Sequence, residues 1–546
     1  MSSPGSLRAP LLWLLLPFMA GLTLAELHRP VPLDVRWGAG VAGGMAVVAW
    51  LFRQRGARGA QFAWSATLIG TAGLAGYLWL PLRSPPGLTW DAAPREVNVV
   101  LEIEQIYAPA PQRKTFSGLA RIVSAEGPAS GLAGQRVYFA AIRRISTVPD
   151  VSGHYRYRGL VEPVPPAVGS SRGFDRYLES LGVRLRLMRG QLHEQQRPPQ
   201  RFRHFCARVR ERLDGILEQG LDRYPQISSL YQAMLLGEKA VLSSEQQSAF
   251  MRSGVFHIFS ISGLHVGVIA TAILSGLTLL RVPRREASIA GLVVLWLYVQ
   301  VTGASTPAER AFLMIAFLVS SRVFRLPGNS LAALAAAAFT TLLLEPRQLF
   351  MAGFQMSYSV VTALVVMGGP LADRWRSAWK PWRELPESHW GWWRHATRWG
   401  GDGFLAAAAI TWAAVIASTP GSIGNFGLFS PGALLGNLVI VPLASLAIIG
   451  GFISLLCGLV GLLPLSILFN HASAVVILTM DALVKWTTAV PGVYFPATFD
   501  RAWMGPAAQV AVLGTMLLVA SRRVPHGHWL AVVVLALTMI LGVKFG

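Results

Sequence analysis

Long apolar runs recur along this chain of 546 residues, and they limit what it can fold into. A helix needs about 20 apolar residues to cross a lipid bilayer. Hydrophobic residues make up 53% of the chain and charged residues only 14%. A soluble domain carries roughly 25% charged residues. We therefore expect a polytopic α-helical membrane protein.

The basic loops between the runs predict the topology. Arg53, Arg55 and Arg58 follow the second run, and loops rich in Lys and Arg stay on the cytoplasmic side. The segment after the third run is then extracytoplasmic. The later basic loops lie on the same side as Arg522 only if the run 434–463 turns back on itself. We therefore predict a re-entrant helix pair over 434–463. The segment 466–490 would then be an interfacial helix. The predicted spans are 10–27, 37–52, 62–82, 256–280, 287–301, 308–321, 331–344, 354–367, 404–418, 434–463, 510–521 and 529–543.

The segment between the third and fourth runs has a different pattern. Residues 96–104, 136–139 and 155–161 alternate in part between apolar and polar positions, with Gly and Pro between them, which is typical of β-strands. We expect a small all-β barrel or sandwich with one short helix over 174–181. It holds seventeen Lys and Arg against ten Asp and Glu from Asp91 to Arg203. Residues 201–221 predict a basic amphipathic helix on the membrane surface, and 227–250 predict a helix too polar to span.

The formal net charge of +21 has three possible sources, and charge alone does not choose between them. Basic cytoplasmic loops, a basic soluble domain and a nucleic-acid partner all produce such an excess. Cys206 lies in a polar helix and Cys457 in an apolar run, so we expect no disulfide between them. No zinc-type spacing of Cys and His occurs.

A polar stretch stands at the start of the fourth run. His257, Ser260, Ser262 and His265 lie there among apolar residues, and polar groups at membrane depth are costly unless they face protein or water. The two histidines are eight residues apart and could share one helix face, lining a wet path that contacts phosphate. Close helix packing around Ser262, Gly263 and Gly267 is the alternative. We expect no metal ligation, because no carboxylate or thiol accompanies the histidines.

Two further sites combine polar residues with apolar runs. Thr302 and Gly303 begin a small polar segment, and Arg310 follows it, suited either to binding phosphate in a cavity or to anchoring at the interface. Gln355 and Ser357 interrupt a span, which indicates interhelical hydrogen bonds or a channel wall.

Other residues predict structural roles. Gly237 and Glu238 predict a turn near the membrane entrance. The stretch 419–430, with Pro420, predicts a loop at membrane depth whose freed backbone groups bond to Asn437. Pro442 permits the break predicted within 434–463.

Several separate motifs together carry a family resemblance. They are 173–178, 182–183, 234–238, Leu242, Phe250, Gly254, His257, 261–265, Tyr298, 302–303, 310–311, Met314, 353–358, 419–420, 426–427, Asn437 and Pro442. In these positions the chain resembles the ComEC family, the inner-membrane DNA channel of natural transformation. The Ile-Ser-Gly-Leu-His run at 261–265 is the most specific of them.

The resemblance implies a division of the chain into five parts. These are N-terminal transmembrane helices over 1–89, an OB-fold-like periplasmic domain over 90–200, amphipathic or interfacial helices over 201–252, a competence-type channel domain over 253–504 and C-terminal transmembrane helices over 505–546. Many members also end in a metallo-β-lactamase-like domain, proposed to degrade the strand that is not transported. No His-x-His-x-Asp-His run occurs here, so we expect this polypeptide to be no enzyme and to hold no metal or cofactor.

The function that follows is passage of single-stranded DNA through the bacterial inner membrane during natural transformation. The implied partners are single-stranded DNA, the lipid bilayer, a periplasmic DNA receptor, a cytoplasmic motor or single-strand-binding protein, and a second copy of the chain if the channel is a homodimer. No Walker-type loop occurs, so another protein must supply energy. OB folds hold single strands on stacked aromatics. The candidates, most of which we expect in the core, are Tyr107, Phe116, Tyr138, Phe139, Tyr155 and Tyr157.

Two other functions fit the same residues. An intramembrane hydrolase would use Ser262 or Ser260 as nucleophile with His265 as base, although no acidic residue stands nearby to orient the imidazole. A transporter of another anionic polymer or of a lipid precursor would use the same broken helices.

Overall fold

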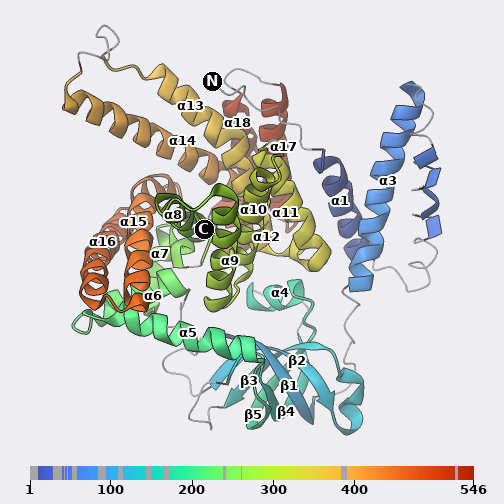
Figure 1. Cartoon of the computed structure of the whole chain (residues 1–546). Coiled ribbons are helices and arrows are strands. Elements are labelled where there is room, and N and C mark those ends of the chain that lie inside the picture. The colour runs from blue at the N-terminus through green and yellow to red at the C-terminus, as the bar shows by residue number, and fades with distance from the viewer. Residues whose placement is uncertain are drawn as a thin grey trace. The chain divides into compact units, whose positions relative to one another are not determined.

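The computed structural model divides the described residues into two compact units (Figure 1). One, here called the barrel unit, comprises Pro10–Arg212 and Phe339–Met351, and the other, the helical unit, comprises Leu213–Ala338 and Ala352–Gly546. The structure describes residues 10–28, 40–41, 43–45, 47–48, 50–51, 58–83, 94–107, 115–142, 149–164, 173–237, 242–259, 261–326, 328–382, 390–522 and 527–545. The predicted span 37–52 and its arginine loop lie mostly outside these residues.

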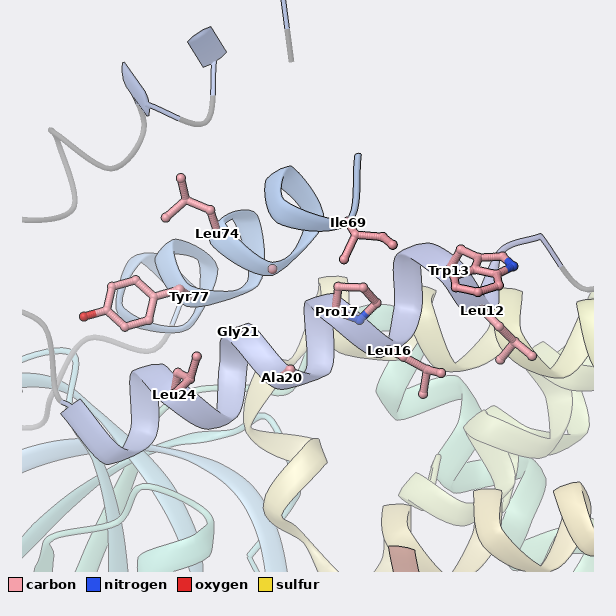
Figure 2. Close-up of a pocket in the computed structure, with 11 residues that line it drawn as sticks. Leu12, Trp13, Leu16, Pro17, Ala20, Gly21, Leu24, Ile69, Leu74 and Tyr77 are labelled. Carbon is pink, nitrogen blue, oxygen red and sulfur yellow. The ribbon is translucent and has the colours of Figure 1, made fainter. Parts of the chain in front are cut away.

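Two apolar helices of the barrel unit cross closely. They are α1 (Leu12–His28) and α3 (Arg58–Arg83). A Cβ on Gly21 would overlap the carbonyl oxygen of Gly73, so the backbones can meet only because the residue is glycine. Beside the crossing is an apolar groove of about 620 Å³, which Leu16 and Leu24 of α1 and Leu74 of α3 help to line (Figure 2).

Five strands form a closed barrel in the order β1-β2-β3-β5-β4, which confirms the predicted OB-like module. Strands β3 and β5 pair in parallel and all other neighbours are antiparallel. A short helix, α4 (Gly173–Ser180), lies in the connection between β4 and β5 and matches the helix predicted for 174–181. The strands are β1 (Arg95–Tyr107), β2 (Thr115–Ala125), β3 (Arg136–Ile142), β4 (His154–Pro163) and β5 (Leu185–Arg197).

Alternation along the strands fills the barrel with apolar side chains. On β3, Val137 and Phe139 point inward and are fully buried, whereas Tyr138 between them faces outward. The ring of Tyr157 lies directly against Gly190, where no side chain would fit, and its hydroxyl donates to the carbonyl of Ala140 over 3.0 Å. Burial raises the pKa of Tyr157, so this hydroxyl stays protonated and keeps the bond.

A segment from the second half of the sequence belongs to the barrel unit. Glu345 lies 3.7 Å from the guanidinium of Arg136 on β3, and the carbonyl of Leu343 accepts a hydrogen bond from the Trp79 indole of α3 over 3.1 Å. Arg347, in the short 3₁₀ turn Pro346–Phe350, lies close to Gly182, just after α4. Residues Phe339–Met351 therefore connect the barrel with the ends of the apolar helices.

The helical unit contains the remaining helices. Two of them replace the single helix predicted for 227–250, because Gly237 adopts a left-handed conformation (φ 74°) that ends the first. Helices α5 and α11 pass from one unit to the other. The helices are α5 (Arg201–Glu218), α6 (Pro225–Leu236), α7 (Ser244–Arg252), α8 (Gly263–Leu279), α9 (Arg284–Val301), α10 (Thr306–Val323), α11 (Ser330–Leu344), α12 (Ala352–Ala363), α13 (Gly369–Ala378), α14 (Trp392–Phe426), α15 (Ala433–Val460), α16 (Leu463–Ala489), α17 (Met504–Arg522) and α18 (His528–Gly542).

Six helical stretches among the described residues are long and apolar enough to cross a membrane, which supports a multi-pass membrane protein. A π-helical turn at Leu364–Gly368 joins α12 to α13 as one of them. They are Trp64–Arg83, Ala352–Ala378, Trp392–Phe426, Ala433–Val460, Leu463–Ala489 and Met504–Arg522. A three-stranded sheet of β6 (Leu428–Phe429), β7 (Phe495–Phe499) and β8 (Val543–Phe545) joins the ends of α14 and α18.

Two predicted breaks are wrong. Helix α15 runs without interruption through Pro442 and Gly450-Gly451, so 434–463 is no re-entrant pair, and α16 is a candidate span rather than an interfacial helix. Likewise α14 continues through Pro420 to Phe426, where a loop was expected from 419. Membrane helices tolerate proline where nearby side chains bond the freed carbonyls.

A buried polar network holds α15, α16 and the end of α5 together. Asn470 of α16 is 0% exposed, and its amide nitrogen donates to the carbonyls of Ile216 (2.8 Å) and Gln219 (3.0 Å). Its amide oxygen accepts from the hydroxyls of Ser454 (2.6 Å) and Tyr231 (3.2 Å). Every hydrogen-bonding position of this side chain is therefore used. Both cysteines are free, as the sequence predicts.

We expect Asn470→Ala to lower the stability of the folded protein by about 2 kcal/mol, because it leaves buried carbonyl and hydroxyl groups unsatisfied. Thermal unfolding in detergent, followed by tryptophan fluorescence, measures the effect. Asn425→Ala is the matched control, since Asn425 is exposed and bonds only the carbonyl of Gly421 in its own helix. Equal unfolding temperatures for the two variants would contradict this role of the network.

Candidate functional site

The predicted polar stretch, from His257 to His265, lies directly before and at the start of α8. Residues Phe256–Phe259 form one 3₁₀ turn, the chain is not helical at Ser262, and α8 begins at Gly263. His257 and His265 therefore do not share one helix face, and that prediction is wrong: His257 is exposed, whereas His265 is 0% exposed. Ser260 lies outside the described residues.

Ser262 and His265 contact each other at the first turn of α8. The imidazole Nδ1 accepts from the backbone N–H of Ser262 over a long 3.4 Å and lies 3.2 Å from its hydroxyl oxygen. A backbone N–H can only donate, so Nδ1 is the acceptor and the neutral ring carries its proton on Nε2. Nε2 is buried and has no hydrogen-bond partner among the described residues. This buried N–H therefore remains available as a hydrogen-bond donor.

Arg310 is almost completely buried close to the start of α8. It stands in the second turn of α10 with 3% of its surface exposed, and its Nη2 donates to the carbonyl of Gly353 at the start of α12 over 2.9 Å. A Cβ on Gly263 would lie 4.0 Å from that of Ala311, so α8 and α10 meet here at van der Waals distance. The starts of α8 and α12 and the second turn of α10 thus converge, and we call this place the helix-start site.

The other polar candidates lie around the helix-start site or next to its helices. Thr302 is buried and bonds the carbonyls of Tyr298 and Val299, and the exposed Gly303 (φ 92°) makes the turn into α10. Gln355 and Ser357 are half-buried on α12.

Two glycines of the predicted structural set make close contacts in tight turns. Gly237 ends α6, and a Cβ there would lie 3.1 Å from Ile261, directly before the helix-start site. Gly254 (φ 75°) faces Ala433 at the start of α15, with 2.8 Å between an added Cβ and the alanine Cβ. Glu238 lies outside the described residues.

The prolines and Asn437 behave differently from expectation. Pro420 is buried within α14 and Pro442 is exposed within α15. The buried Oδ1 of Asn437 accepts no hydrogen bond from any described residue. Instead Gln509 of α17 donates to the carbonyl of Ala417, three residues before Pro420, over 2.6 Å. The sequence analysis missed Gln509 because its partner lies 92 residues away.

The aromatic candidates of the barrel divide as expected. Phe116, Phe139, Tyr155 and Tyr157 are buried in the core, and Tyr107 and Tyr138 face outward. In the part of the chain that the structure describes, no three His, Cys, Asp or Glu side chains cluster as metal ligands do.

The helix-start site offers hydrogen-bond donors in an apolar setting. A guanidinium and an imidazole N–H both suit an anionic ligand. Because His265 and Arg310 are both buried, the helix starts must separate before any ligand from solvent can reach them.

Comparisons with known proteins identify the helical unit. The family model described as Competence protein matches residues 234–525, more than half of the chain and including the whole helix-start site. ComE operon protein 3 of Bacillus subtilis (strain 168) is 30% identical over 168 residues. The aligned segment covers 31% of this chain and about a fifth (21%) of that protein. No solved structure matches the chain. The chain belongs to the family of competence proteins, the ComEC family that its motifs resemble.

Proposed function

We propose that this protein acts in DNA uptake during competence, as a membrane channel for single-stranded DNA in the bacterial inner membrane. Membership of the competence family supports the uptake role. The observation that carries the channel proposal is the helix-start site, where Arg310 and His265 are both buried near the starts of the neighbouring helices α10 and α8.

The physical demand on such a channel is the charge of its cargo. Each nucleotide brings one negative charge, and a bare charge in hydrocarbon is prohibitively costly. Arg310 supplies a fixed positive charge inside the helical unit, and it is the kind of group that binds phosphate through two parallel hydrogen bonds. Its present acceptor is a backbone carbonyl, which a phosphate oxygen can replace once the helix starts separate.

The barrel would receive the strand on the periplasmic side. Its net excess of basic residues between Asp91 and Arg203 attracts a polyanion without fixing one sequence. The channel path would run through the region proposed as 253–504, past His257, Ser262, His265, Thr302, Arg310, Gln355 and Ser357. A partner protein would supply the driving force, and nuclease activity would come from elsewhere.

One observation favours an intramembrane hydrolase instead. The hydroxyl of Ser262 lies 3.2 Å from Nδ1 of His265, within the range of a nucleophile and its base. A serine hydrolase also orients the far nitrogen of its histidine with a third group. Here Nε2 has no hydrogen-bond partner among the described residues, so the arrangement favours a helix cap over a triad.

Ser262→Asn separates these two functions. Asparagine is as good a helix N-cap as serine, so the start of α8 is kept while the nucleophilic hydroxyl is lost. We expect transformation frequency within about threefold of the unaltered protein in a competent host whose own copy is deleted. Loss of transformation by several orders of magnitude at normal protein level would favour the hydrolase.

Two replacements of His265 distinguish a structural from a cargo-binding role. His265→Asn places a side-chain amide near the Nδ1 position and keeps the bond to Ser262, whereas His265→Gln extends it toward the Nε2 position. We expect His265→Gln to retain more DNA uptake than His265→Asn, since the proposal assigns cargo contact to Nε2. Uptake of labelled DNA per cell, with membrane protein level as control, measures this, and the reverse order would show that the cap is what matters.

For Arg310 the expected effect is a loss of uptake of at least about tenfold in Arg310→Gln, which keeps a donor to Gly353 but removes the charge. Arg322→Gln is the control, because Arg322 is exposed in the last turn of the same helix. Equal uptake by both variants would remove the charge of Arg310 from the proposal.

A further inference from the structure

Four aromatic rings gather on the outside of the barrel and form the outer aromatic cluster. They are Tyr107 at the end of β1, Tyr138 on β3, and Phe174 and Tyr177 on α4. The rings of Tyr107 and Tyr138 stack with centroids 6.3 Å apart. Phe174 stands edge-on to Tyr138 (5.2 Å) and to Tyr107 (6.1 Å), and Tyr177 lies 6.1 Å from Phe174.

The cluster is open on one side. Phe174 is 43% exposed and Tyr177 is 40% exposed, while Tyr107 and Tyr138 beneath them are half-buried. Other aromatic rings on the barrel strands, such as Phe139 and Tyr157, are fully buried. The cluster thus offers flat apolar faces to the surroundings.

Attachment of α4 to the barrel does not need these exposed rings. Leu178 of α4 and the following Leu181 and Val183 are buried against Leu119 of β2, and they form a small apolar core of their own. Figure 1 shows α4 beside the barrel. Phe174 and Tyr177 therefore expose more apolar surface than the packing of this helix requires.

The place of the cluster in the barrel indicates its ligand. It is built from the end of β1, the outer face of β3 and the connection between β4 and β5. In OB folds the face of strands 2 and 3, with the loops after strands 1 and 4, holds oligonucleotides.

Two arginines lie near the cluster. Arg136 precedes Tyr138 by two residues on the same outer face, and Arg186 pairs in register with Tyr138. Both guanidinium groups are paired with carboxylates, Arg136 with Glu104 (2.6 Å) and Arg186 with Glu162 (3.1 Å), so they add little net charge there. Tyr107 stays neutral, because burial and then the hydroxyl contact with Tyr177 (3.5 Å) raise its pKa. No phenolate therefore forms there to repel a phosphate.

We propose that the outer aromatic cluster is a platform on which the bases of single-stranded nucleic acid stack, with Phe174 and Tyr177 as its accessible rings. This inference rests on the proposed function and names the surface through which the barrel would grip the strand. Stacking needs unpaired bases, so the platform would select single strands over duplex. It would not select a sequence, since every base has a flat face.

The test is binding of a fluorescein-labelled oligothymidine to the full chain purified in a neutral detergent without lipid. Stacking is worth about 1–3 kcal/mol per base, and 1.4 kcal/mol is tenfold in affinity. We expect the double variant Phe174→Leu, Tyr177→Leu to bind at least about fivefold more weakly. The slope of log affinity against log salt should stay unchanged, because no phosphate contact is removed.

Two control variants make the result specific. Tyr177→Phe keeps the ring and should bind as the unaltered chain does. Phe205→Leu removes an exposed ring on α5, outside the cluster, and should also leave binding unchanged. A thermal unfolding curve for each variant shows that the fold is retained.

The outcomes separate the platform from the channel proposal. If the unaltered chain binds the oligonucleotide and the double leucine variant binds it equally well, the platform is wrong and the proposed function stands. If the unaltered chain does not bind at all, the platform is wrong, and uptake of labelled DNA by the Arg310 variants decides the proposed function. If the double variant binds the oligonucleotide normally but loses affinity for vesicles of phosphatidylethanolamine and phosphatidylglycerol, the rings are membrane anchors, and the platform is again wrong.

Discussion

Backbone hydrogen bonding inside an apolar solvent is the constraint on which the helical unit depends. Each carbonyl that a proline or a helix end leaves free must find a donor in the protein, because lipid supplies none. Gln509 donates beside Pro420, and Asn470 donates to two carbonyls at the end of α5. Single side-chain amides therefore hold distant parts of the chain together.

The same constraint explains the character of the helix-start site. Helix starts carry unpaired backbone N–H groups, so they cost least where protein groups surround them. Three such starts converge around Arg310 and His265, which places hydrogen-bond donors together in an apolar environment. Under the proposed function, these donors would hold a phosphate only after the helix starts separate.

Hydropathy and the alternation of apolar and polar residues predicted the architecture. The features that they did not predict depend on contacts between residues far apart in the sequence. The apolar runs predicted most helices within a few residues, and the alternation of β1, β3 and β4 predicted the barrel. The prediction that His257 and His265 share one helix face was wrong, because α8 begins only after Ser262, which caps it. The break predicted in α15 was wrong, since the helix continues through Pro442 and both glycines. Asn470, Gln509 and the outer aromatic cluster gave no local signal, since their partners lie far away in sequence.

Residues Phe339–Met351 belong to the barrel unit, whereas the chain before and after them belongs to the helical unit, and this has a mechanical consequence. Met351 packs against the small apolar core under α4, and Gly353, whose carbonyl holds the guanidinium of Arg310, follows only two residues later. A peptide chain barely stretches, so tension applied to that core is transmitted along these few bonds to the first turn of α12. The covalent chain thus links the small apolar core beside α4 to the carbonyl that holds Arg310 through only two residues.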